Sequence, residues 1–298
     1  MINCLMMKIE CPISGDSGDK CNWMIREGSV RDFPDTRILE CQECQLVTHS
    51  TDLSQSVNYD KGSMHDWAAG YGGILPHLAN DIVRRVASIR DLEKKYNFES
   101  ILDFGCGDGG MIGPLSALYE TLGLEPELRA RESAKQKGFK VYESSESAVA
   151  DGVIVDVITL FHVVEHLYNP TIELERIYNL LRPGGLVIIE TPNSNDALLT
   201  KYENVAFQNF TYWSHHPTVH SHKSLQVLVE RNKFRVVENQ GIQRYDLNNH
   251  LYWLTKGLPG GHEVLKGTFT TDVIESYALS LIANKSCDTL WLVAQKGH

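Results

Sequence analysis

The stretch Ile101-Leu102-Asp103-Phe104-Gly105-Cys106-Gly107-Asp108-Gly109-Gly110 decides the fold predicted for this chain of 298 residues. It begins as a short apolar run, which is typical of a buried strand, and passes directly into a glycine-rich turn. Residues 111–119 follow as a predicted helix. Glycines at such a turn allow sharp bends and let the backbone approach a ligand closely. The order of strand, glycine turn and helix therefore predicts a nucleotide-binding unit.

Strand and helix patterns alternate on both sides of this stretch, which indicates a parallel sheet with helices on both faces. A helix is expected before it, because apolar residues recur at helical spacing over 74–96. The further strands are expected at 121–125, 139–142, 153–160, 186–190, 234–237 and 289–294, and the further helices at 126–137, 165–181 and 224–232. Residues 245–285 look mostly helical and interrupt the sheet before its last strand.

The chain is expected to have three parts. Residues 1–50 are a Cys-rich segment with short strands around 38–48, and residues 51–73 are a polar linker or lid. Residues 74–298 form the α/β domain, including the helical insertion at about 245–285. The sequence does not define an oligomeric state.

Charge and hydropathy exclude several classes of protein. The formal net charge is -10, from 38 acidic and 28 basic residues. Nucleic-acid affinity depends largely on Lys and Arg, so a nucleic-acid partner is not expected. No apolar run of about 18 residues and no signal peptide are found, which predicts a cytoplasmic protein without a membrane partner. A small-molecule substrate fits this composition better.

Glu125 and Asp103 indicate which nucleotide would bind at the glycine turn. Glu125 lies 20 residues beyond Gly105 at the end of the next strand, where an acid can accept hydrogen bonds from two ribose hydroxyls. A dinucleotide-binding enzyme is the alternative. The Gly-x-Gly-x-Gly spacing argues against it, because a pyrophosphate is bound by Gly-x-Gly-x-x-Gly. The Asp103 carboxylate would also repel a diphosphate, whereas it suits an ammonium group.

Four motifs in order resemble those of the class I S-adenosylmethionine-dependent methyltransferases. Residues 102–109 resemble their first motif and Gly123-Leu124-Glu125-Pro126 the second, while 156–167 and 180–190 resemble the segments at their fourth and fifth strands. The resemblance covers roughly residues 74–240 and the closing strand. It implies a doubly wound, mostly parallel seven-stranded sheet, with the last strand inserted antiparallel, and S-adenosylmethionine as cofactor.

The resemblance also implies roles for individual residues. Asp103, Gly105 and Gly107 would contact the methionine end of the cofactor, and Cys106 belongs to the same loop. Glu125 would bind the ribose. Phe161 and His162 would line the pocket near the sulfonium.

A histidine-rich stretch follows the fifth strand, at residues 212–222. Ligands of doubly wound sheets bind beyond the carboxyl ends of the strands, so this stretch is expected near the acceptor. Transfer to a hydroxyl often needs a base, for which histidine is suited near neutral pH. His216 and His220 are the candidates for this base. The alternative is that these histidines are capping or core residues, with His222 simply preceding the next helix.

The run His162-x-x-Glu165-His166 admits two interpretations. Related enzymes with Glu-x-x-Glu-His bind a divalent ion there, and spacings of three and four place side chains on one helix face. Here His162 stands at the first position. We therefore favour the second interpretation, in which Glu165 and His166 bond to the backbone and orient the loop.

Five of the seven cysteines lie in the first 44 residues. Cys41-x-x-Cys44 is typical of half a zinc knuckle, and Cys11-Pro12-Ile13-Ser14-Gly15 resembles the other half of the zinc ribbons that precede some sugar and antibiotic methyltransferases. Ser14 stands where a cysteine is expected, and Cys21 or Cys4 would complete the site. One structural zinc on Cys11, Cys21, Cys41 and Cys44 is one interpretation. A degenerate ribbon that holds no metal is the other.

The acceptor is expected to be a small molecule. A saccharide or nucleotide-sugar, methylated at a hydroxyl or carbon, is the first interpretation, and it rests on the resemblance of the flanking segments. The alternative is O-methylation of a quinone, polyketide or other metabolite. A protein that binds the cofactor without catalysis is a third interpretation. Replacing histidines in the 215–222 stretch distinguishes it, because only an enzyme should lose function.

Overall fold

The structure is a computed structural model that describes residues 11–13, 21–56 and 77–297. Most of the predicted linker, the start of the helix expected from residue 74, and Cys4 lie outside the described residues. The described chain divides into two compact units. One is built from the described residues of Met1–Val57, His162–Ile172 and Ile189–Ala294, and the other from those of Asn58–Phe161, Glu173–Ile188 and Gln295–His298.

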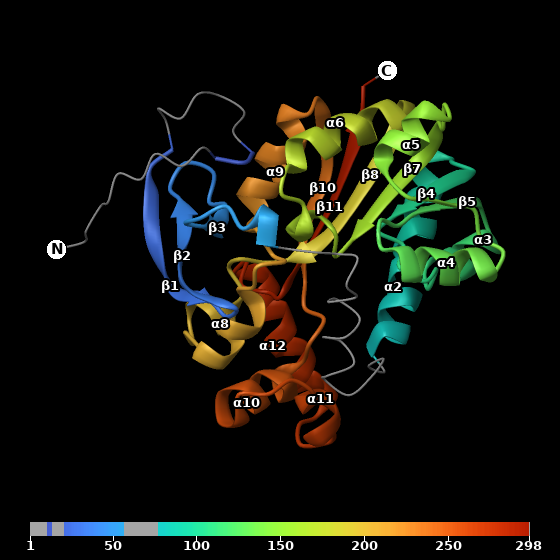
Figure 1. The fold of residues 1–298 in the computed structure, drawn as a ribbon. Helices are drawn as coiled ribbons and strands as arrows, with labels where there is room; N and C mark the ends of the chain where they lie inside the picture. Colours follow the sequence, from blue (N-terminus) through green and yellow to red (C-terminus); the bar gives the residue numbers. More distant parts are fainter. Residues whose placement is uncertain (1–10, 14–20, 57–76, 298) are drawn as a thin grey trace. The chain divides into compact units, whose positions relative to one another are not determined.

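A seven-stranded sheet has the order β10-β11-β8-β7-β4-β5-β6 (Figure 1). Strand β4 pairs in parallel with β5 and β7, and β5 pairs in parallel with β6. The last strand, β11, is inserted between β10 and β8, as the sequence predicted. The strands are β4 (Ser100–Phe104), β5 (Glu120–Leu124), β6 (Val141–Tyr142), β7 (Val155–Phe161), β8 (Leu181–Pro192), β10 (Phe234–Ile242) and β11 (Thr289–Lys296). The predicted fold class, a mostly parallel doubly wound α/β sheet, is confirmed.

Helices alternate with these strands along the chain. They are α2 (His77–Tyr96), α3 (Ile112–Ser116), α4 (Leu128–Gln136), α5 (Ser145–Ala150) and α6 (Pro170–Leu180). Helix α2 buries Asp81, Arg85, Ile89 and Leu92, which recur at helical spacing. Helix α5 was not predicted. It is short, and a capping box between Ser144 and Ser147 starts it.

The boundaries of two elements differ from those expected. The helix expected at 165–181 begins only at Pro170, because proline is suited to the first helical position, and the short 3-10 turn η3 (Val164–His166) precedes it. Strand β8 begins at Leu181, five residues earlier than expected, and contains Gly184 and Gly185. A Cβ at Gly185 would lie 2.9 Å from the carbonyl oxygens of Arg182 and Asp156, so Gly185 permits close approach of backbone and does not end the strand.

A second sheet has the order β1-β2-β3-β9 and lies in the first of the two units. Its strands are β1 (Trp23–Val30), β2 (Phe33–Cys41), β3 (Val47–His49) and β9 (Thr218–Val219). The neighbours pair antiparallel, and the register places Val47 opposite Val219. The two-residue strand β9 was not predicted, because its pairing depends on a partner about 170 residues away in the sequence. An apolar cluster supports this sheet: Val30, Ile38, Val47, Leu53, Leu199, Tyr212 and Val219.

The remaining helices belong to the same unit. They are η1 (Ser54–Ser56), α7 (Ala197–Thr200), α8 (Val205–Thr211), α9 (His222–Arg231), α10 (Leu247–Lys256), α11 (Gly261–Val264) and α12 (Thr271–Ala283). The last three lie between β10 and β11 in the chain and form the predicted helical insertion. In the described part of the chain, no helix combines the length and the apolar character needed to cross a membrane.

Candidate functional site

The glycine turn after β4 has the backbone conformation that a close ligand contact requires. Gly105, Gly107 and Gly109 all have positive φ, at 73°, 56° and 89°. This left-handed region favours glycine over residues with a side chain. A Cβ placed at Gly107 would meet no described atom within 4 Å, whereas one at Gly109 would lie 2.6 Å from the Phe139 ring. The backbone at Gly107 therefore borders open space, and that at Gly109 is packed.

Glu125 binds the glycine turn from the end of β5. Its Oε2 accepts a hydrogen bond of 2.9 Å from the Gly107 N–H, and its Oε1 accepts one of 2.8 Å from the Glu127 N–H at the start of α4. A carboxylate can accept about four hydrogen bonds, so these two are compatible with further bonds to a ribose diol. Glu125 thus holds the loop and caps the helix. The sequence predicted a cofactor role for Glu125 but missed the bond to Gly107.

Asp103 is a buried carboxylate at the end of β4. Its Oδ1 accepts a hydrogen bond of 2.7 Å from the Thr159 hydroxyl on β7. Burial raises the pKa of Asp103 to about 6, although the Thr159 hydrogen bond and the nearby Arg85 charge oppose this shift. A buried acid that is costly to ionise is well suited to a cationic ligand, because the ligand's charge would favour the carboxylate form.

Cys106 and Phe161 take different positions at this site. The Cys106 side chain packs with Ile112, Ala134 and Val141 in an apolar cluster, so we assign it a packing role, and its backbone belongs to the turn. Phe161 ends β7, and the Arg85 guanidinium lies over its ring, 4.6 Å from the ring centre. Asp103, Gly107, Glu125 and Phe161 all belong to the second unit, in which β4, β5 and β7 end.

A second group of functional side chains lies in the other unit. Glu165, His166 and His216 each place one ligand atom within 4.8 Å of the others. The His166 Nδ1–H donates to the His215 carbonyl at 2.6 Å, and the His216 Nδ1–H donates to the Thr211 carbonyl at 2.9 Å. These bonds define the tautomer of each ring and leave Nε2 with its electron pair. Histidines that bind metals commonly donate their other N–H to a carbonyl in this way.

Burial and charge determine the protonation of this group. Burial lowers the pKa of His166, and it lowers the pKa of His216 to about 3, so both rings are neutral near pH 7. Burial opposes ionisation of Glu165, but the hydrogen bond from His162, together with the neighbouring imidazoles, outweighs it and lowers the pKa of Glu165 to about 2. The Thr191 hydroxyl donates to its other oxygen at 2.9 Å. The group therefore combines one carboxylate with two neutral imidazoles.

His162 follows β7 directly and has φ of 57°, which is uncommon for a residue other than glycine. Its Nδ1 lies 3.1 Å from Glu165 Oε1, and Arg244 Nη1 lies 2.7 Å from its Nε2. Because the guanidinium can only donate, Nε2 accepts and Nδ1–H donates to Glu165. Arg244 was not predicted as a site residue, since nothing in its local sequence marks it. Strained backbone of this kind is frequent at functional sites.

The other histidines of the 212–222 stretch have structural surroundings. His220 is fully buried, with Nε2 and Nδ1 each 3.4 Å from the hydroxyls of Thr218 and Ser224, and burial lowers its pKa to about 4. The His215 ring stacks on Trp213. His222 begins α9 and lies 2.8 Å from the Asn239 amide oxygen. These surroundings favour packing and capping roles, so His216 is the candidate base that we retain.

The fold and the glycine turn together define the class of protein. A parallel sheet with its last strand inserted, a glycine turn after β4 and an acid at the end of β5 form the class I methyltransferase fold. The chain belongs to the family of the methyltransferase domain, whose model matches residues 71–239. The predicted membership of the S-adenosylmethionine-dependent methyltransferases is thus confirmed, and with it the predicted class of enzyme.

Individual relatives agree with this assignment. The chain is similar to the ubiquinone biosynthesis O-methyltransferase of Dinoroseobacter shibae, with 31% identity over 166 residues, which are 50% of this chain and 66% of that protein. The matched segments span about half to two thirds of the curated relatives. In fold it resembles a SAM-dependent methyltransferase from Archaeoglobus fulgidus, with TM-score 0.51, 19% identity and coverage of 78% and 99% of the two chains. It also resembles the plantazolicin methyltransferase BpumL in complex with SAH, with TM-score 0.52, 17% identity and coverage of 83% and 94%.

Proposed function

We propose that the protein transfers the methyl group of S-adenosylmethionine to a hydroxyl oxygen of a small phenol- or quinol-like metabolite. The family match supports the methyl transfer. The names of curated relatives such as the Dinoroseobacter shibae protein support an oxygen acceptor of this type. These names favour the acceptor predicted as the alternative, a quinone or similar metabolite. They do not support the acceptor predicted first, a saccharide or nucleotide-sugar.

The cofactor-binding part of the proposal rests on Asp103, Gly107 and Glu125. The open space at Gly107 lets the backbone border a ligand, Glu125 would accept hydrogen bonds from the ribose, and the buried Asp103 would pair with the methionine ammonium. S-adenosylmethionine supplies an electrophilic methyl group on a sulfonium. The acceptor oxygen forms a bond to the methyl carbon while the carbon–sulfur bond breaks, and the hydroxyl proton must leave the acceptor.

Glu165, His166 and His216 are the proposed residues for the acceptor. One possible ligand atom of each residue lies within 4.8 Å of the others, and each imidazole donates its Nδ1–H to a backbone carbonyl. This arrangement fits a divalent cation that would be held by Glu165 and by Nε2 of each histidine. A bound cation would make a coordinated hydroxyl more acidic. The alternative is that His216 itself accepts the proton. A histidine whose pKa is about 3 is a weak base near pH 7, so the cation interpretation is favoured.

The proposal is tested by measuring S-adenosylhomocysteine release from purified protein with two panels of acceptors, catechols and hydroquinones in one and nucleotide-sugars in the other. We expect turnover only in the first panel. His216→Asn should lower kcat by about 10²-fold or more, the usual contribution of a group that helps remove the proton. His222→Asn is the matched control and should keep its activity, because His222 bonds to Asn239 at the start of α9.

Two results would contradict this proposal. Turnover of nucleotide-sugars alone would restore the first interpretation, and no binding of S-adenosylhomocysteine would remove the methyltransferase function. Metal content of the Glu165→Gln variant separates the two roles of the histidine group. Loss of a divalent ion together with activity supports cation binding, and lost activity without any lost ion supports His216 as the base.

A further inference from the structure

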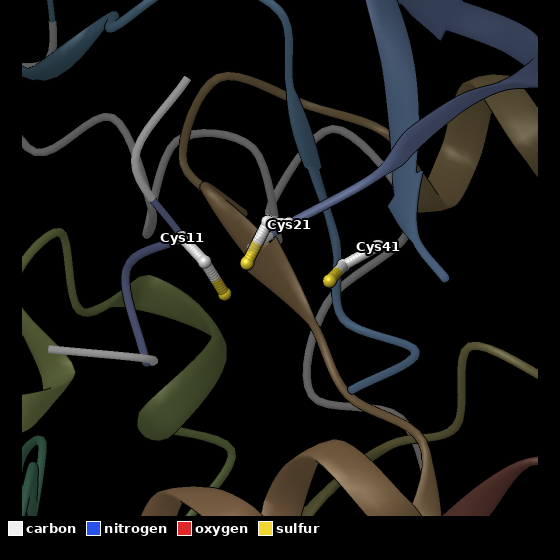
Figure 2. A group of neighbouring side chains, drawn as sticks. All are labelled: Cys11, Cys21 and Cys41. Carbon is white, nitrogen blue, oxygen red and sulfur yellow. The ribbon is translucent and has the colours of Figure 1, made fainter. Parts of the chain in front are cut away.

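Three cysteines that are far apart in the sequence converge in the structure. The sulfur atoms of Cys11, Cys21 and Cys41 lie within 4.8 Å of one another, and Figure 2 shows them pointing toward a common point. The sulfur of Cys44 lies 3.6 Å from that of Cys11. No disulfide joins the six described cysteines. All four residues of this cysteine cluster belong to one unit.

The register of the small sheet explains this convergence. Strand β1 begins at Trp23, which is opposite Cys41 at the end of β2, and the Gln42 N–H donates to the Asn22 carbonyl at 2.8 Å. Cys21 therefore reaches Cys41 through backbone pairing. The turn at 41–46 closes with a bond of 2.8 Å from the Cys41 N–H to the Leu46 carbonyl. Within it, the Cys44 N–H points to Cys41 Sγ at 3.5 Å, a bond that supports a metal-bound thiolate.

We propose that Cys11, Cys21, Cys41 and Cys44 bind one structural zinc ion. Zinc binds four thiolates tetrahedrally with Zn–S bonds of about 2.3 Å, which requires sulfur atoms about 3.8 Å apart. The 3.6 Å between Cys11 and Cys44 and the limit of 4.8 Å among Cys11, Cys21 and Cys41 are close to this requirement. Cys11, Cys41 and Cys44 are buried. The ribbon pattern expects a cysteine at position 14, where this chain has serine. Cys21 supplies the fourth ligand instead.

A zinc ion has a clear structural role here. The cysteines lie at the end of the β1–β2 pair away from its turn, and the apolar cluster that contains Val30 and Tyr212 supports the rest of the sheet. Small sheets with few apolar residues commonly need a metal or disulfide for stability. Cys11 also precedes Pro12, whose carbonyl accepts a hydrogen bond of 3.1 Å from Thr171 at the start of α6. Zinc would thereby join the segment around Cys11 to the sheet.

The same sheet holds the turn that carries His216. The Thr48 hydroxyl on β3 donates to the Pro217 carbonyl at 2.8 Å, and β3 pairs with β9. Asp32, in the β1–β2 turn, accepts a hydrogen bond of 3.0 Å from the Ser214 N–H. Both contacts flank His216 in the sequence. Zinc loss should therefore disturb the proposed acceptor residues. This consequence rests on the proposed function, whereas the zinc site itself is independent of it.

The metal is tested on protein produced with added zinc and purified without chelator. Elemental analysis should find about one zinc per chain in the cysteine cluster, besides any divalent ion at Glu165, His166 and His216. The double variant Cys41→Ser/Cys44→Ser should lose it, and Cys287→Ser, a buried cysteine outside the cluster, is the matched control and should keep it. The single variant Cys21→Ser should release zinc to a competing chelator faster than the wild type. Cobalt-substituted wild type should show the absorption of tetrahedral thiolate coordination.

Several outcomes would overturn the zinc site. These are wild-type protein without zinc, a double variant with as much zinc as the wild type, iron in place of zinc, or a disulfide among the four cysteines in non-reducing mass spectrometry. If the double variant fails to fold, zinc release from the wild type during thiol titration tests the site instead. Zinc release should be complete when four cysteines have reacted. Folded double variant should bind S-adenosylhomocysteine normally and lose acceptor turnover. Normal turnover without zinc would refute only the effect on His216.

Discussion

Replacing Glu125 tests how the cofactor site is built. The carboxylate accepts one hydrogen bond from the Gly107 N–H and one from the Glu127 N–H, at 2.9 and 2.8 Å. Glu125 is only 9% exposed, so water cannot readily replace it as the acceptor. Glu125→Ala removes both bonds and, if the proposed cofactor role is right, two more to the ribose diol. Glu125→Gln keeps one acceptor oxygen but turns an NH₂ group toward the other N–H.

The magnitude follows from these bonds. A hydrogen bond to a charged group contributes about 1.5–3 kcal/mol, so Glu125→Ala should lower the free energy of unfolding by about 3–6 kcal/mol and Glu125→Gln by roughly half of that. Each ribose bond lost should weaken cofactor binding by about one to two orders of magnitude. The control is Glu132→Ala on the same helix, α4. Glu132 is exposed and pairs with Lys135 three residues along the helix, so a loss of about 0–1 kcal/mol is expected.

Urea unfolding measures the stability, and calorimetry with S-adenosylhomocysteine measures the affinity of each folded variant. Either of two results would contradict the predicted role of Glu125. Wild-type stability of Glu125→Ala would show that the two backbone bonds are not formed. Lost stability with unchanged affinity in Glu125→Gln would show that Glu125 only caps α4 and holds the turn, without binding the ribose.

Three further predictions concern Asp103, His250 and Gly109. Because the pKa of Asp103 is raised to about 6, affinity for S-adenosylhomocysteine should rise from pH 5 to 7 as the carboxylate ionises, and Asp103→Asn should bind more weakly with no such rise; an unchanged pH profile in calorimetry would contradict this. Burial lowers the pKa of His250 from 6.5 to about 4, so the unfolded chain takes up a proton first and stability should fall by up to about 3 kcal/mol as pH falls from 6.5 to 4. In urea unfolding at several pH values, His250→Gln should reduce this slope, and an equal slope would exclude His250 as its source. Gly109→Ala should destabilise by about 2–4 kcal/mol, because it adds a clash with the Phe139 ring to the cost of positive φ, whereas Gly152→Ala, with positive φ but open space, should cost about 1 kcal/mol; equal melting temperatures would contradict the packing at Gly109.

Local patterns in the sequence were sufficient for the parallel sheet and the glycine turn. The apolar run of β4 and the glycines after it form one contiguous stretch, so their periodicity and turn chemistry are visible without any partner. Glu125 could be predicted in the same way, because it directly follows β5, the next strand in the chain. The boundary between α6 and β8 was predicted wrongly, because a local glycine signal was misread. Gly184 and Gly185 look like the end of a helix, but both lie within β8, where Gly185 permits close backbone packing.

The remaining features depend on contacts between distant segments, which only the tertiary structure decides. The bond between Arg244 and His162, the pairing of β3 with β9, and the group of Glu165, His166 and His216 join residues about 50 to 170 positions apart. No local period encodes such contacts, because the backbone register and the packing of other elements bring the partners together. The sequence by itself determined which cysteines and histidines were candidates. The structure decided that Cys21 meets Cys41 and that His216, rather than His220, lies beside Glu165, since strand register and burial act only in the folded chain.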